Sequence, residues 1–150
     1  MVDDHVLLLK SMVRMLAGCD TVTATDPREA LQILRSHGDQ FDAIVSDVMM
    51  PGLNGPELYA HCFRSSPELA ARFVFASGDP QAAGPMIAQT ATSLGAARVP
   101  TLLTKPTSRS TLMAAVMAAA AGSTHQSGTY ELGQPCAAPA EIKELRGSRH

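Results

Sequence analysis

Five polar side chains stand where short apolar runs of this chain end, and together they suggest a chemistry. They are three carboxylates, a hydroxyl and an ammonium: Asp3, Asp4, Asp47, Ser77 and Lys105. Three carboxylates held together repel one another unless a cation lies among them, and Mg²⁺ prefers oxygen ligands of this kind. The set predicts phosphoryl transfer onto a carboxylate, in which Asp47 attacks phosphorus while Mg²⁺, Ser77 and Lys105 hold the phosphoryl oxygens. Asp47 must be ionised to react, and we expect the neighbouring cations to favour that state.

These side chains can meet only if the apolar runs before them are parallel strands of one sheet. The run before Asp47 is short and partly β-branched, and turn residues follow it, which is typical of a buried parallel strand. Similar runs lie at 22–25, 73–76 and 99–104, and helical patterns begin near residues 6, 26, 54, 80 and 108. Alternating strands and helices predict an α/β fold in which the strand ends, with their polar residues, share one edge.

Composition restricts the classes of function. The chain has 150 residues, 45% of them hydrophobic, and a net charge of -2, which gives no basis for binding nucleic acid or an anionic membrane. The three cysteines, Cys19, Cys62 and Cys136, lack paired or metal-ligand spacing, and no apolar stretch approaches the length of a membrane span. We therefore expect a cytoplasmic domain over 1–121, followed by a flexible tail or linker over 122–150, where apolar periodicity is lost.

Four segments, taken in order, resemble the receiver (response regulator) domain of two-component signal transduction: Asp3-Asp4, the run from Asp47 to Gly55, Ser77-Gly78 and Lys105-Pro106. The separations of 43 residues from Asp4 to Asp47 and 30 from Asp47 to Ser77 agree with that family. The resemblance implies a flavodoxin-like, doubly wound five-stranded parallel sheet of order 2-1-3-4-5.

The same resemblance implies the roles of the site residues. Asp47 would be the phosphoacceptor, Asp4 a direct Mg²⁺ ligand, Asp3 a ligand through water, and the backbone carbonyl of Met49 a further ligand. A sensor histidine kinase or a histidine phosphotransfer domain would donate the phosphoryl group from phosphohistidine, so that the domain transmits or drains a signal. Such a domain catalyses only its own phosphorylation and dephosphorylation and is not otherwise an enzyme.

Three departures from the family pattern modify these expectations. Only Met1 and Val2 precede the acidic pair, so we expect the first strand to be truncated at the N-terminus. The chain would then be a piece of a longer protein, such as a hybrid sensor kinase, or a sequence whose start was assigned too late. Leu102 stands three residues before Lys105, where the family often has Phe or Tyr, which favours a relay or sink role over an aromatic switch. The 28 residues from Ser77 to Lys105 predict extra residues in the fourth helix or its loops.

Other interpretations of the same residues stay open. The chain could be a docking module that works without phosphorylation, or an aspartate-nucleophile phosphatase of the haloacid-dehalogenase type, although Met49 stands where that class needs a second aspartate. Considered one at a time, Asp3 and Asp4 could be no more than helix-capping residues, and Lys105 could be a solvated surface residue. Asp79 could either cap the next helix or line the rim of the pocket.

The short first strand leads to a prediction about stability. Each missing buried aliphatic residue is worth about 1.5 to 3 kcal/mol, and a whole domain is stabilised by only about 5 to 15 kcal/mol. We therefore expect the chain to be poorly stable alone and an added upstream apolar strand to raise its melting temperature, which calorimetry would measure. An extension that leaves the melting temperature unchanged would contradict this.

Overall fold

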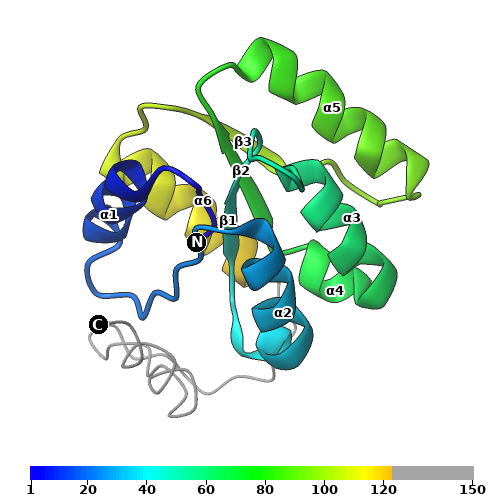
Figure 1. Ribbon diagram of the computed structural model, residues 1–150, viewed down its shortest axis with the longest axis horizontal. Coiled ribbons are helices and arrows are strands. Elements are labelled where there is room, and N and C mark those ends of the chain that lie inside the picture. Colours follow the sequence, from blue (N-terminus) through cyan, green and yellow to red (C-terminus); the bar gives the residue numbers. More distant parts are fainter. Residues whose placement is uncertain (123–150) are drawn as a thin grey trace.

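The computed structural model describes residues 1–122, which form a parallel sheet flanked by helices on both faces (Figure 1). The sheet has the strands β1 (Ile44–Asp47), β2 (Phe73–Ser77) and β3 (Thr101–Thr104), paired in the order β1-β2-β3. All three strands lie within segments predicted as strands, except that β2 extends one residue further. The predicted tail over 122–150 falls outside the described residues, except for residue 122.

Most of the α-helices begin at a capping side chain, close to the predicted helix starts. The helices are α1 (Val6–Met15), α2 (Pro27–His37), α3 (Gly55–Ser65), α4 (Pro67–Ala70), α5 (Pro80–Ser93) and α6 (Arg109–Ala121), with a short 3-10 helix η1 (Gly38–Gln40). Asp26, Asn54 and Ser108 each accept a hydrogen bond from the first turn of α2, α3 and α6. None of the helices in this part of the chain has the length and apolar character needed to cross a membrane.

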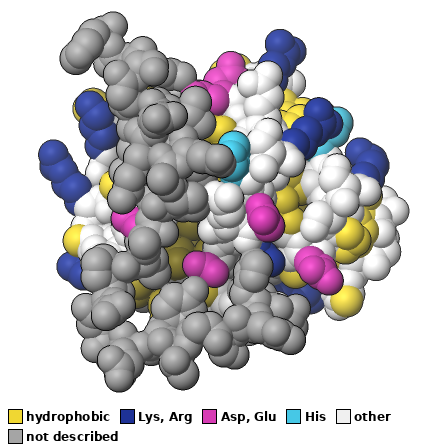
Figure 2. Space-filling view, turned by 90° about the horizontal axis from the view of Figure 1, so that it is seen from below, with side chains coloured by type: hydrophobic (Ala, Val, Ile, Leu, Met, Phe, Trp, Pro, Cys, Tyr) yellow, Lys and Arg dark blue, Asp and Glu magenta, His cyan; other side chains and the backbone are white. Residues whose placement is uncertain are grey.

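Two apolar clusters hold the helices to the sheet. On one face α1 and α6 pack together, through Met12, Leu16, Val45, Val74 and Leu112 among others. On the other face α2, α3 and α5 pack through a larger cluster that includes Leu34, Ile44, Leu58, Phe75 and Ile87. Because β2 is buried along its whole length, it anchors both clusters. On the described part of the face shown in Figure 2, acidic and basic side chains are interspersed.

The first two predicted strands are represented by single residues. Val2 forms isolated parallel bridges to Ala24 on one side and to Ser46 on the other. Its N–H donates to the carbonyl of Val45 at 2.8 Å, and its carbonyl accepts from the N–H of Asp47 at 2.8 Å. The three strands do not confirm the predicted order of five, because one paired residue on each of two segments is too little to form a strand.

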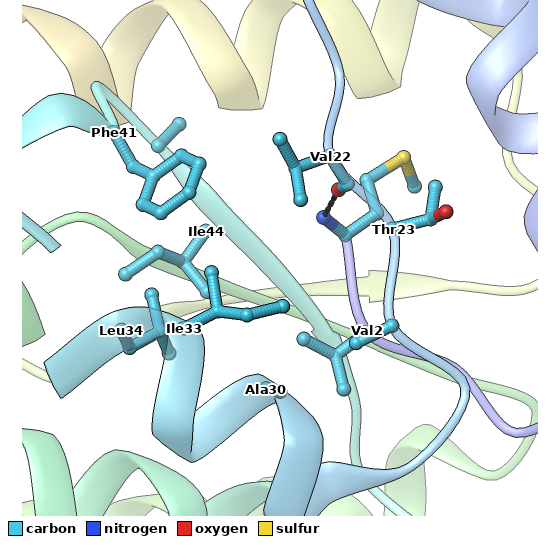
Figure 3. A pocket seen from close by; sticks show the side chains of 11 residues that line it. Val2, Val22, Thr23, Ala30, Ile33, Leu34, Phe41 and Ile44 are labelled. Carbon is cyan, nitrogen blue, oxygen red and sulfur yellow. Dashed lines mark hydrogen bonds between the residues drawn. The ribbon is translucent and has the colours of Figure 1, made fainter. Parts of the chain in front are cut away.

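The amino group of Met1 is buried beside this bridge, at the edge of the pocket drawn in Figure 3. It donates a hydrogen bond of 2.6 Å to the carbonyl of Val22. Next to it is a small cavity of about 30 Å³ whose lining includes Ile33, Phe41 and Ile44. Because burial in apolar surroundings disfavours the charged form, it lowers the pKa of this amino group to about 5.

The buried amino group gives a pH dependence of stability. With a free amino group at Met1, the free energy of unfolding should rise from about pH 5 to pH 8, because the unfolded chain, with a pKa of 8.0, then binds a proton that the folded chain has released. The full effect is on the order of 4 kcal/mol, and urea unfolding at several pH values would measure it. The same chain with an acetylated amino group should lack this component; an equal rise in both would contradict the prediction.

Candidate functional site

One ammonium group joins two carboxylates at the carboxyl edge of the sheet. Asp47 is the last residue of β1, Lys105 directly follows β3, and Asp3 follows the bridging residue Val2. The Nζ atom of Lys105 lies 2.6 Å from Oδ2 of Asp3 and 2.8 Å from Oδ1 of Asp47. These side chains are only 12%, 4% and 11% exposed, so Lys105 is not a solvated surface lysine.

A third carboxylate completes an acidic cluster. One carboxylate oxygen each of Asp3, Asp4 and Asp47 lie within 4.8 Å of one another. Asp3 is buried and also accepts a hydrogen bond of 2.8 Å from the backbone N–H of His5, whereas Asp4 is exposed. Three carboxylates carry three negative charges and Lys105 offsets one of them. The donor set therefore fits a divalent cation that prefers oxygen ligands.

Burial and charge act in opposite directions on Asp47. Burial raises the pKa of Asp47 above its ordinary value, and the charge of Asp3 adds to this, while the hydrogen bond and charge of Lys105 and the N–H of Val48 lower it. Lys105 favours the ionised form as we expected, but the effect of burial on the pKa of Asp47 outweighs it. Burial alone would lower the pKa of Lys105, but hydrogen bonds and charges from both carboxylates raise it above its ordinary value.

The junction between β1 and α3 is compact. The N–H of Gly55 donates to the carbonyl of Val48 at 3.0 Å, and Asn54 and Glu57 form a capping box at the start of α3. A Cβ atom on Gly55 would overlap the backbone carbonyl of Asp47. Gly55 was predicted only as part of the turn after the strand that ends at Asp47; a glycine so soon after a strand is also a signal of close backbone approach.

The remaining predicted site residues have more local contacts. Ser77 ends β2, is 2% exposed and accepts a hydrogen bond of 3.1 Å from the N–H of Asp79. The N–H of Lys105 donates to the Ser77 carbonyl at 2.8 Å, which fixes the two strand ends together. Asp79 is the N-cap of α5, the first of its two predicted roles. Met49 is 60% exposed, and the role of its carbonyl stays a prediction.

The chain is similar to a known family of domains and to parts of several known proteins. Residues 1–117 match the response regulator receiver domain. The two-component response regulator ARR11 of Arabidopsis thaliana is 40% identical over 62 residues, which are 40% of this chain and 12% of that protein. The sensor kinase CckA of Brucella abortus (strain 2308) is 40% identical over 50 residues, 33% of this chain and 5% of that protein. The matched segments are thus a small part of these relatives.

Several solved structures match this chain over most of the length of both chains. The signal receiver domain of NarL from Mycobacterium tuberculosis has a TM-score of 0.63 and 31% identity, and the match covers 81% of this chain and 93% of that chain. A response regulator receiver domain protein from Clostridium thermocellum has a TM-score of 0.65 and 24% identity, covering 80% of this chain and 90% of that chain. The second match supports the fold alone.

The close approach at Gly55 gives a prediction for stability. Gly55→Ala should lower the free energy of unfolding by about 1 to 3 kcal/mol, because the added methyl group meets backbone atoms that cannot move cheaply. Gly84→Ala in α5 is the matched control, since its Cβ would have only Leu102 within 4.0 Å and alanine favours a helix. Urea unfolding of both variants would measure the difference. If the two substitutions had the same effect, Gly55 would not be a site of close packing.

Proposed function

Because the chain belongs to the family of response regulator receiver domains, we propose that it takes a phosphoryl group from a phosphohistidine onto Asp47 in a two-component phosphorelay. The observation that carries the proposal is the contact of Lys105 with Asp3 and Asp47 inside a cluster of three carboxylates. Structural roles alone would not explain why an ammonium and these carboxylates are gathered from three distant segments, since burying them is costly.

The proposed reaction forms one bond and breaks one. A carboxylate oxygen of Asp47 bonds to phosphorus as the bond from phosphorus to the imidazole nitrogen of the donor breaks, and that nitrogen keeps the electron pair. Lys105 and Ser77 bind two of the phosphoryl oxygens and offset their charge. Lys105 supports this role because its ammonium is already 2.8 Å from Oδ1 of Asp47.

Asp3, Asp4 and Asp47 would hold Mg²⁺, with the backbone carbonyl of Met49 as a further ligand. The cation supplies positive charge that offsets the charge of the phosphoryl oxygens when it is bound. The charges of the cluster support this assignment. Asp3, Asp4 and Asp47 carry three negative charges, and the ammonium of Lys105, which contacts Asp3 and Asp47, offsets only one of them.

The finer assignments are proposals as well. Val2 and Ala24 would belong to the first and second strands of a sheet of order 2-1-3-4-5, which the bridges of Val2 support. The partner would be a sensor histidine kinase or a histidine phosphotransfer domain in the cytoplasm, and the chain itself would have no further enzymatic activity. Leu102, which packs against the cluster of α2, α3 and α5, supports a relay or sink role.

Phosphorylation can be tested directly. The chain with Mg²⁺ and acetyl phosphate should gain one phosphoryl group, detected by intact-protein mass spectrometry, because its site would use a small phosphodonor in place of a kinase. Asp47→Asn should abolish the gain, since an amide is not a nucleophile at this position. Asp79→Asn is the control: asparagine can also cap α5, so this variant should be phosphorylated normally. A wild-type chain that gains nothing would favour the docking module.

A further inference from the structure

Ser46 is a fully buried hydroxyl residue directly before the proposed phosphoacceptor. It lies in β1 with 0% exposure and pairs in register with Phe75 of β2. Its Oγ donates a hydrogen bond of 2.9 Å to the backbone carbonyl of Asp47. A buried hydroxyl is costly unless it is hydrogen-bonded, and here its partner is the main chain of the reactive residue.

The carbonyl of Asp47 depends on this hydroxyl. The N–H of Asp47 pairs with Val2, and since the N–H and C=O of one residue in a parallel ladder point to the same side, the Asp47 carbonyl faces away from β2. Among the described residues no backbone N–H donates to it; the hydroxyl of Ser46 does. Gly55 lies against the same carbonyl without a side chain.

The peptide group between Asp47 and Val48 links Ser46 to the carboxylate. Its carbonyl accepts from Ser46, and its N–H donates to Oδ1 of Asp47 at 2.9 Å and to the carbonyl of Ala76 at 3.2 Å. Because the peptide group is planar, a rotation that moves the carbonyl also moves the N–H. Within the Asp47 carboxylate, Oδ1 accepts hydrogen bonds from Lys105 and from the N–H of Val48, whereas Oδ2 has no hydrogen bond in the described residues.

We propose that Ser46 is a positioning residue for the phosphoryl transfer: it fixes the Asp47–Val48 peptide group, which holds Oδ1 and leaves Oδ2 directed at the incoming phosphorus. The proposal rests on the proposed function and adds a residue that contacts neither the phosphoryl group nor the cation. Without the hydroxyl, the carbonyl of Asp47 loses its donor, the peptide group can rotate, and the carboxylate spends less time in the reactive orientation.

The first test compares rate with cation affinity. Ser46→Ala should lower the rate of phosphorylation by acetyl phosphate at saturating Mg²⁺ by about tenfold, as expected for the loss of one orienting hydrogen bond. Its Kd for Mg²⁺, from calorimetry, should change much less than the rate, by at most about twofold, because Asp3 and Asp4 are not bonded to the Asp47–Val48 peptide group. Ser65→Ala is the matched control, since Ser65 also donates to a backbone carbonyl but lies at the end of α3, and it should change neither quantity. Ser46→Cys should restore part of the rate.

A second test does not depend on phosphorylation. Amide hydrogen exchange, followed by NMR, should be at least about tenfold faster at Val48 in Ser46→Ala, while the amide of Ile44, which bonds to Arg72, reports any general loss of stability. An unchanged phosphorylation rate, an equal loss of rate and Mg²⁺ affinity, or an unchanged Val48 amide would each overturn the proposal. A wild-type chain that cannot be phosphorylated would instead overturn the proposed function, and with it the catalytic meaning of Ser46.

Discussion

The structure depends on one shared charge. The ammonium of Lys105 contacts Asp3, which is 102 residues away in the sequence, and Asp47, which is 58 residues away. Charged groups this deeply buried are stable only as partners, because each alone would be costly to remove from water. The bond therefore requires the end of β1, the end of β3 and the residue after Val2 to meet at one edge of the sheet. One ammonium offsets only one of the three negative charges of Asp3, Asp4 and Asp47. Further positive charge bound at the cluster would therefore be favourable.

In that arrangement the backbone that carries Asp3 has the least strand pairing, because Val2 alone forms bridges there. Four backbone hydrogen bonds fix it to its neighbours: from Val2 to Val45, from Asp47 to Val2, from Asp3 to Ala24 and from Ala24 to Met1. Immediately before them, the amino group of Met1 is enclosed among apolar side chains, where its charge is unfavourable. Asp3, one member of the acidic cluster, thus directly follows the shortest strand pairing in the described residues. Binding of a cation to the carboxylates would stabilise this region, because a ligand that binds only the folded form shifts the folding equilibrium toward it.

Much of this site could be predicted from the sequence, because the ends of strands and the starts of helices are marked by characteristic residues nearby. The residues that end β1 and β2, the lysine after β3 and the caps Asp26, Asn54 and Ser108 all follow from turn and capping chemistry. The segment 22–25 was predicted as a strand, but only Ala24 pairs, because Val2 is the only residue beside it that forms a bridge in the described residues. The helix α4 was missed although Ser66 and Pro67 are a helix start. Burial decides the pKa of Asp47, and burial depends on tertiary packing that no local pattern reports.

The two halves of the site differ in how firmly they are held. The Asp47 half is fixed by Ser46, by the N–H of Val48 and by the close approach of Gly55, all of which act on the same peptide group or its neighbours. The Ser77 half rests on a turn, in which the Ser77 hydroxyl accepts from Asp79 and, in the described residues, donates no hydrogen bond. In the proposed reaction its O–H can therefore donate a hydrogen bond to a phosphoryl oxygen without losing an existing one. Leu102 packs as an aliphatic side chain against the cluster of α2, α3 and α5, so it provides no aromatic ring that could turn on phosphorylation, in line with the proposed relay or sink role.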